Sequence, residues 1–292
     1  MNNATSLGDR IREQWDFWNS EGAILYRPDT LTTRSVIQEG VKLHLIHNAC
    51  RDVYDRSLKS IDKPIGNKTP FSDGTNPELA RTADQQFKVL GNRFACMQYQ
   101  SILAPVETQE TLTSSFLGIS LQFACANPEL TLMYNAINAG KTVPHQYWLL
   151  SFSAYETLKR PLGTYQLLGM VSGLALYKCD VPCYMITFDI SEDTAVAVEI
   201  LCRLIGFMEQ KNFNLFLFSN RAYFIPREDV EIPTGFENHR FGGLEMIGYF
   251  IMKSVETLES ADPAMLLDGI RQISYDQTNQ RRLERHLLHE LQ

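Results

Sequence analysis

The sequence has no concentration of basic charge. Its 292 residues include 27 Lys and Arg against 34 Asp and Glu, for a formal charge of −7, and no run of Lys or Arg exceeds two residues. A protein that coats DNA or RNA needs a cationic surface that displaces counterions from the phosphates. We therefore expect no nucleic-acid polymer as a partner, while the charge leaves room for a pocket that takes one small nucleotide.

Long apolar stretches are also missing. The first 18 residues are polar and contain no apolar segment of signal-peptide length. No segment approaches the roughly 18 uninterrupted apolar residues that a membrane-spanning helix needs. These absences predict a protein of the cytoplasm that does not enter a membrane.

Cysteine is sparse and irregularly spaced. The six cysteines lie mostly inside apolar stretches, which favours buried free thiols in a reducing compartment over disulfides. Cys179 and Cys183 are four residues apart, but no second pair of Cys or His lies nearby, so a zinc ribbon is not supported. We predict no metal site and no cofactor.

The composition that is present suits a folded core. Hydrophobic residues make up 44% of the chain, aromatic residues 11% and charged residues 21%. These fractions are ordinary for globular proteins and unlike those of disordered chains. At 292 residues the chain is long for one compact core and comfortable for two packed halves.

Hydrophobic periodicity predicts elements from both classes. In the first half we expect a helix over 8–20, a loop over 60–77, and strands over 87–90 and 97–104 joined by a turn at Gly91 and Asn92. A helix over 107–126 and strands over 130–135 and 147–152 follow. The second half is expected to contain a strand over 184–190, a helix over 192–210 capped by Ser191, a hairpin of 213–218 with 222–225, and closing helices from Phe241 and over 262–291.

This mixture of strand pairs and long helices, without regular β–α alternation, predicts an α+β fold. We divide the chain into an N-terminal helix and loop region (1–86), a first half with the pocket (87–160) and a second half with closing helices (161–292).

Two blocks in the first half resemble a known family. The segments VLGNRF (89–94) and YQSILAP (99–105), followed by Gln109, are similar to an "L-x-N-x-F … H-x-L-L-x-P … Q" pattern. The segments LMYN (132–135) and NAGKTVPHQYWL (138–149) resemble "F-N … A-G-A-S-x-P-H-x-H-x-Q". Diadenosine-tetraphosphate phosphorylases and GDP-galactose phosphorylases carry these patterns, and galactose-1-phosphate uridylyltransferases share the second.

Two further blocks lie in the second half. NFNLFLF (212–218) with RAYFIPR (221–227) resembles the hairpin "Y-N-V-L-L … R-x-x-L-x-P-R", and EMIG (245–248) with YFIMK (249–253) resembles "W-E-I-S-G-H-x-V-L-K". The four blocks together are similar to the nucleotide-phosphorylase branch of the histidine-triad superfamily. The resemblance implies two packed histidine-triad-like halves, antiparallel sheets with flanking helices, whose pocket comes mainly from the first half.

The catalytic histidine of that family is replaced in this sequence. There the second histidine of H-x-H-x-Q attacks the α-phosphorus and carries the nucleotide covalently. With the Pro-His pairs aligned, His145 takes the first histidine position, Tyr147 the position of the nucleophile, and Leu149 that of the glutamine. The resemblance therefore implies a related site whose usual covalent mechanism is in doubt.

Three interpretations remain open for this site. Tyr147 is the nucleophile in the first, although a phenol with a pKa near 10 attacks poorly at neutral pH unless it is activated. His145 is an acid or base in the second. The site binds without turnover in the third. A histidine beside Trp148 in an apolar strand is also commonly a packed, hydrogen-bonded residue, and alternation sets His145, Tyr147 and Leu149 on one side of a strand.

The resemblance also suggests residues that contact a nucleotide or phosphate. Asn48 and Arg51 lie where GDP-galactose phosphorylases have "L-N-x-G-R", and a surface charge on a helix is an equal interpretation of Arg51. His44 and His47, three apart, would share a helix face there. The remaining candidates for substrate binding are Asn92, Asn135, Gly140, Thr142, Arg227 and Glu245. Glycine at 140 would allow a phosphate close to the backbone, but the spacing is not that of a P-loop.

The function that follows is a diverged nucleotidyltransferase or phosphorylase-like enzyme. It would act on a nucleotide, a nucleotide-sugar or another phosphorylated small molecule without a histidine–nucleotidyl intermediate. The alternatives are a non-catalytic relative that binds a nucleotide or metabolite, and an enzyme of specialised metabolism that uses the pocket for other acid–base chemistry. A homodimer is one assembly that we consider.

Overall fold

The computed structural model describes residues 6–51, 76–82, 84–93, 95–106, 111–141, 145–152, 155–160, 164–229, 233–236 and 241–289. Thr142 lies outside these residues, and so does the side chain of Arg51. In the described part of the chain, no helix is both long enough and apolar enough to cross a membrane.

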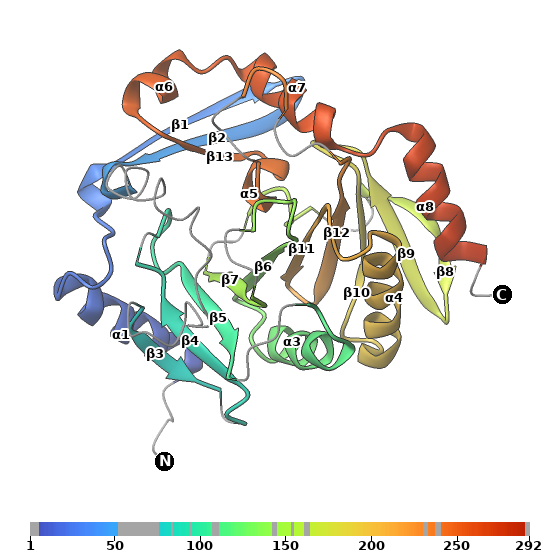
Figure 1. Ribbon diagram of the computed structural model, residues 1–292, viewed down its shortest axis with the longest axis horizontal. Helices are drawn as coiled ribbons and strands as arrows, with labels where there is room; N and C mark the ends of the chain where they lie inside the picture. Colours follow the sequence, from blue (N-terminus) through green and yellow to red (C-terminus); the bar gives the residue numbers. More distant parts are fainter. Residues whose placement is uncertain are drawn as a thin grey trace.

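A ten-stranded antiparallel sheet forms the centre of the described structure, in the order β3-β4-β5-β7-β6-β11-β12-β10-β9-β8 (Figure 1). Its strands are β3 (Glu78–Arg81), β4 (Phe87–Gly91), β5 (Ser101–Pro105), β6 (Thr131–Asn135), β7 (Trp148–Ser151), β8 (Gln166–Val171), β9 (Leu174–Cys179), β10 (Met185–Asp189), β11 (Phe213–Phe218) and β12 (Arg221–Pro226).

The two halves of this sheet have the same topology. Three strands, a helix and two strands follow one another as β3-β4-β5-α3-β6-β7 and again as β8-β9-β10-α4-β11-β12, with α3 at Ser114–Ala126 and α4 at Thr194–Phe207. In each half the fifth strand lies between the third and the fourth: β7 lies between β5 and β6, and β12 lies between β10 and β11. The halves meet where β6 pairs with β11. The order of strands therefore repeats although the sequence shows no internal repeat.

Helices cover one face of the sheet. Figure 1 shows α3 and α4 side by side there, with α1 (Leu7–Ser20) beside β3 and α8 (Gln277–His289) beside β8. The first hydrophobic core lies between these helices and the sheet and contains large buried side chains such as Trp15 and Trp148. Its burial supplies the main favourable term for folding, since apolar surface leaves water.

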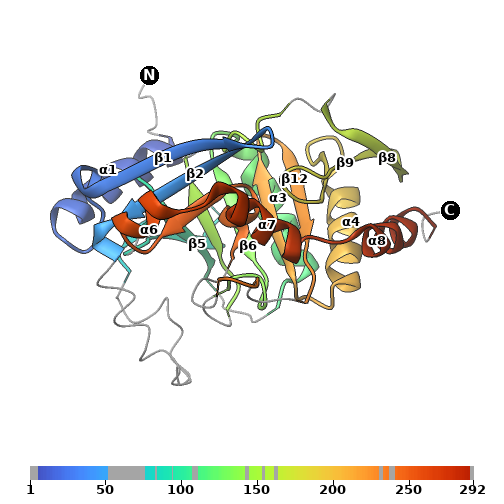
Figure 2. The ribbon, with the colours of Figure 1, turned by 90° about the horizontal axis from the view of Figure 1, so that it is seen from above.

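A three-stranded sheet covers the other face. Its strands are β1 (Leu31–Gln38), β2 (Val41–Asn48) and β13 (Tyr249–Met252), and β13 runs parallel to β2. Figure 2 shows this small sheet lying across the large one together with α6 (Val255–Ser260) and α7 (Pro263–Ile273). The short helix α5 (Gly243–Met246) leads into β13, and a second hydrophobic core fills this layer.

The α+β class with antiparallel sheets and flanking helices is confirmed. So are the helix over 8–20 and the hairpin of β11 with β12. The division at 86 and 87 separates β3 from β4, which pair with each other, and the domain boundaries stay a prediction.

Several local predictions were wrong. Asp193, rather than Ser191, caps α4, because its carboxylate accepts from the backbone N–H groups of Ala195 and Val196. His44 and His47 belong to strand β2 and not to a helix, so a spacing of three points them to opposite faces. The connection from β4 to β5 occupies 92–100 and is not a two-residue turn.

Candidate functional site

The predicted site lies on the connection in which the two halves differ most. In the second half, Ser219 and Asn220 alone join β11 to β12. In the first half, the corresponding connection from β6 to β7 spans 136–147 and carries Gly140 and His145. The longer connection is therefore a feature of the first half, where the sequence placed the pocket.

Asn135 joins three segments at the end of β6. Its Oδ1 accepts from the side-chain amide of Asn214 at 2.8 Å and from the backbone N–H of Gly243 at 3.1 Å. The same Asn214 amide donates to the carbonyl of Ala139 at 2.8 Å. Asn214 is fully buried, so these hydrogen bonds are shielded from water and hold β6, β11, the β6–β7 connection and α5 together.

Gly140 allows two backbone segments to meet. It has φ +92°, and a Cβ added there would lie 2.7 Å from the Cα of Gly242. A Cβ on Gly243 would lie 2.9 Å from the sulfur of Met133 and 3.1 Å from the Asn135 Oδ1. Side chains are thus excluded from this junction, and the backbones of 140 and 242–243 approach one another beside Asn135.

Arg227 and Glu245 hold the segment before β13 in place. Arg227, with 1% of its surface exposed, donates from Nη1 to the carbonyl of Phe241 at 2.6 Å and to the Asn214 Oδ1 at 3.5 Å. Glu245, which is also buried, accepts from the Gly242 N–H at 2.8 Å. The structure therefore brings Asn135, Gly140, Arg227 and Glu245 into one network.

Tyr147 directly precedes β7. The register of β6 and β7 pairs Thr131 with Ser151 and Met133 with Leu149, and the pairing ends there. Tyr147 and Leu149 both pack on a small apolar cluster of Leu90, Ile102 and Ala104, as alternation predicts. His145 is half-buried, two residues before Tyr147.

Lys141 and Tyr134 lie beside this group and were not predicted. The Lys141 Nζ donates to the Tyr134 hydroxyl at 3.2 Å and lies 5.2 Å from the centre of its ring. Burial raises the pKa of the Tyr134 phenol well above its usual range, and the nearby Tyr147 raises that pKa further. The phenol of Tyr134 therefore stays protonated at neutral pH and can donate a hydrogen bond.

Asn48 and Asn92 brace a different segment. Asn48 is buried, donates to the carbonyl of Ala95 at 3.1 Å, and accepts from the Cys50 N–H at 3.1 Å. Asn92 donates to the Gln100 Oε1 at 3.3 Å. These contacts stabilise the connection from β4 to β5, which is a structural role for both asparagines.

Sequence reasoning missed Asn214, Gly242 and Gly243 as members of the network. Asn214 had one signal, because it is the polar residue inside the apolar strand FNLFLF. Gly242 and Gly243 gave no signal in the sequence, because their role depends on neighbours that only the structure shows. In the described ranges, no group of three or more His, Cys, Asp and Glu lies close enough to hold a metal ion.

Comparison with known proteins gave structural neighbours but no sequence match. No protein-family model matches the chain, and no curated protein matches it by sequence. Solved structures of yeast Ap4A phosphorylase Apa2 do match. In its complex with Ap4A that enzyme is 14% identical, the match covers 93% of this chain and 98% of the enzyme, and the TM-score is 0.67.

The chain has the fold of this phosphorylase. Two further structures of Apa2 support the likeness, with TM-scores of 0.62 for its complex with AMP and 0.65 for the enzyme itself, at 14% and 13% identity. They cover 92% and 93% of this chain and 96% and 95% of the enzyme. The fold that the four sequence blocks implied, with antiparallel sheets and flanking helices, is thus confirmed.

Proposed function

We propose that the protein is a diverged nucleotidyltransferase or phosphorylase-like enzyme. It binds a nucleotide, a nucleotide-sugar or another phosphorylated small molecule beside Asn135 and Tyr147, and it forms no histidine–nucleotidyl intermediate. The neighbouring fold belongs to an enzyme solved with Ap4A and with AMP, which supports a nucleotide over other ligands. Fold alone does not assign a reaction, so the proposal depends on the site.

The observation that carries the proposal is the junction of Gly140 with Gly242 and Gly243. The N–H groups of Gly242 and Gly243 are already bound by Glu245 and Asn135, so the junction is closed and serves to fix the backbone. It anchors the connection from β6 to β7, on which His145 lies. Asn214 and Arg227 hold this junction from within the sheet. These hydrogen bonds fix the polar groups of the site before a charged substrate binds. Fixed polar groups stabilise the charge that develops in a transition state because they need not reorient during the reaction.

His145 is the proposed general acid or base. Tyr147 packs on apolar side chains, and a phenol with an ordinary pKa near 10 attacks poorly at neutral pH. We therefore propose direct transfer of the phosphoryl or nucleotidyl group to an acceptor. In this step His145 takes the proton of the attacking hydroxyl while the acceptor oxygen forms its bond to phosphorus. The bond from phosphorus to the leaving oxygen breaks, and the phosphate, pyrophosphate or nucleotide that leaves keeps the electron pair of that bond and goes into solution.

Labelling experiments test this proposal. The protein is incubated with α-³²P-labelled nucleoside triphosphates, Ap4A and nucleotide-sugars, and both turnover and protein-bound label are measured. We expect turnover without label on the wild-type protein, and loss of turnover in His145→Ala with substrate binding retained. Tyr147→Phe should keep activity, because the phenol is not the nucleophile. Label on the wild-type protein that disappears in Tyr147→Phe would contradict the proposal.

A second candidate is a non-catalytic relative that binds a nucleotide or metabolite. The packing of Tyr147 on Leu90, Ile102 and Ala104 favours it, since a side chain that fills an apolar cluster needs no chemical role. Calorimetric binding of AMP with no turnover of any labelled compound would support this candidate. His145→Ala would then leave the affinity for AMP nearly unchanged.

A further inference from the structure

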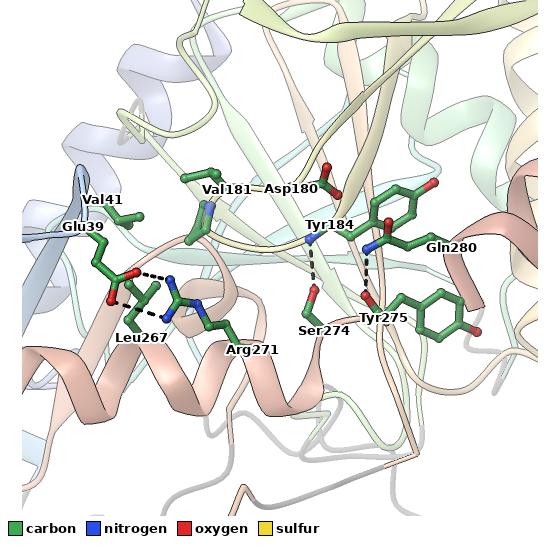
Figure 3. Close-up of a pocket in the computed structure, with 11 residues that line it drawn as sticks. Glu39, Val41, Asp180, Val181, Tyr184, Leu267, Arg271, Ser274, Tyr275 and Gln280 are labelled. Carbon is green, nitrogen blue, oxygen red and sulfur yellow. Dashed lines mark hydrogen bonds and ion pairs between the residues drawn. The ribbon is translucent and has the colours of Figure 1, made fainter. Parts of the chain in front are cut away.

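A cavity lies away from the candidate site. It has a volume of about 220 Å³, and none of the predicted site residues lines it. Figure 3 shows Glu39 from the β1–β2 turn and Arg271 from α7 on one side, and Tyr184 from the strand side on the other, with Val181 and Asp180 between them. Three separate parts of the fold therefore form its walls.

Of the three charged residues that line this cavity, Asp180 is the one outside the ion pair of Glu39 with Arg271. Both nitrogens Nη1 and Nη2 of Arg271 donate to the two carboxylate oxygens of Glu39, so these two charges cancel. Asp180 lies at the exposed rim, next to Val181, whose carbonyl accepts from the Arg160 Nη1 at 3.2 Å, and among the described lining residues no ion pair involves its carboxylate. A carboxylate at the rim of a partly enclosed space attracts a cation more strongly than it does in open water.

The C-terminal end of α7, which adjoins the cavity, also carries partial negative charge. Helix α7 ends at Ile273, and its carbonyl end, which carries partial negative charge, faces the region of Ser274 in the cavity wall. The amide end of the next helix, α8, has the opposite sign, but the Asp276 carboxylate accepts from the Asn279 N–H at 2.8 Å and offsets it. The balance at this junction therefore also favours a cation.

Part of the remaining wall is apolar, beside the polar Ser274 and Gln280. Val181, Leu267 and the ring of Tyr184 line the cavity. The Tyr184 hydroxyl donates to the Glu284 Oε1 at 3.2 Å. Because the hydroxyl already has this partner, Tyr184 offers its ring to a ligand in the cavity. A cation with an apolar body matches such walls, because the body leaves water while the charge meets a carboxylate.

We propose that this cavity is a second ligand site, for a small organic cation whose primary ammonium group pairs with Asp180 and whose alkyl body packs against Val181 and Leu267. The site is independent of the proposed nucleotide function. Because its walls come from the β1–β2 turn, the segment before β10 and α7, an occupant joins the small sheet to the large one. Occupancy therefore stabilises the folded state by mass action.

The experiment uses n-butylammonium chloride, with sodium butyrate at the same ionic strength as the anionic counterpart of equal length. Thermal unfolding and calorimetry are followed across a titration of each compound. We expect a saturable rise in Tm with n-butylammonium alone. Asp180→Asn should weaken the affinity about tenfold or more, and Val181→Phe should weaken it by filling the cavity.

Glu192→Gln is the matched control, because it removes an exposed carboxylate outside the cavity. This control should bind n-butylammonium as the wild-type protein does. Three results would overturn the proposal: no saturable binding of n-butylammonium, equal binding by Asp180→Asn and the wild type, or equal binding of butyrate. Retained binding by Val181→Phe would place the compound elsewhere and overturn it as well.

Discussion

The side-chain amide of Asn214 donates to the Oδ1 of Asn135 at 2.8 Å, across the strand pair at which the two halves of the sheet meet. Asn135 belongs to the first half and Asn214 to the second. The bond therefore connects the predicted pocket to the half that was expected to support it. Through Asn214, the buried Arg227 also reaches this point.

Asn214→Ala should destabilise the protein and loosen the site. The change removes the amide that serves both Asn135 and the carbonyl of Ala139, and buried groups left without a partner cost about 1–3 kcal/mol each. Urea unfolding should show a loss of about 2 kcal/mol or more. The control Gln166→Ala, at an exposed position of the edge strand β8, should stay within about 0.5 kcal/mol of the wild type. Equal losses in the two variants would contradict the role of Asn214.

Comparing Gly140→Ala with Gly173→Ala separates two reasons why a position needs glycine: a positive φ and a backbone neighbour too close for a Cβ. Both glycines have positive φ, +92° and +87°, so both substitutions incur the left-handed backbone cost of about 1–2 kcal/mol. Only Gly140 has a neighbouring backbone in the way, at 2.7 Å, whereas nothing lies within 4 Å of a Cβ on Gly173. We expect Gly140→Ala to lose more stability in urea unfolding and to weaken AMP binding. Matching losses in both proteins, with AMP binding unchanged, would refute a tight junction at Gly140.

His44 should make stability depend on pH. Burial lowers its pKa below the ordinary 6.5, and the effect of burial outweighs that of the nearby Glu156, which acts in the opposite direction; Lys42 lowers the pKa slightly further. The unfolded chain then binds the proton more readily, so stability is present above about pH 6.5 and falls as the pH drops toward the folded pKa.

Urea unfolding at about pH 7.5 and about pH 5.5 measures this dependence. The variant His44→Phe keeps a ring to stack on Tyr249, which lies 4.4 Å away between ring centres, but it cannot be protonated. The difference in stability between the two pH values should therefore shrink in the variant. A difference as large as that of the wild-type protein would assign the effect to other groups.

Glu284→Ala should detach α8 from the sheet. The Glu284 Oε1 accepts from the Lys178 Nζ at 2.7 Å and from the Tyr184 hydroxyl, and only 16% of the side chain is exposed. We expect a loss of about 1–3 kcal/mol, since burial shields the pair from water. Glu199→Ala breaks an ion pair with Arg203 in which the carboxylate is half exposed, and should cost about 0.5 kcal/mol. Amide hydrogen exchange along 277–289 gives a local measure, and unchanged protection there would count against this prediction.

Elements with a strong local pattern were predictable from the sequence. The apolar runs 213–218 and 222–225 become β11 and β12 because both of their faces are buried, and the stripe of α4 packs on the sheet as its spacing indicates. The four motifs likewise brought Asn135, Gly140, Arg227 and Glu245 to attention, and the structure joins these residues in one network.

Strands with a weak pattern were missed. In β1 and β8 most residues are half exposed or exposed, so their sequences lack a clear apolar face. The strand β13 was read as part of a helix, because four residues are too few to show a period, and its pairing with β2 joins segments about 200 residues apart.

The sequence by itself determined the class of the fold and the net charge of −7 without a long run of Lys or Arg, and it predicted tyrosine where the family that it resembles has a histidine. These depend on composition, local periodicity and residue identity. Only the tertiary structure decided that both halves share one topology, that Asn214 holds Asn135, and that Gly140 meets Gly242. Each of these relationships depends on contacts between residues far apart in the chain, and no local pattern specifies which distant partner a buried polar group or a bare backbone will meet.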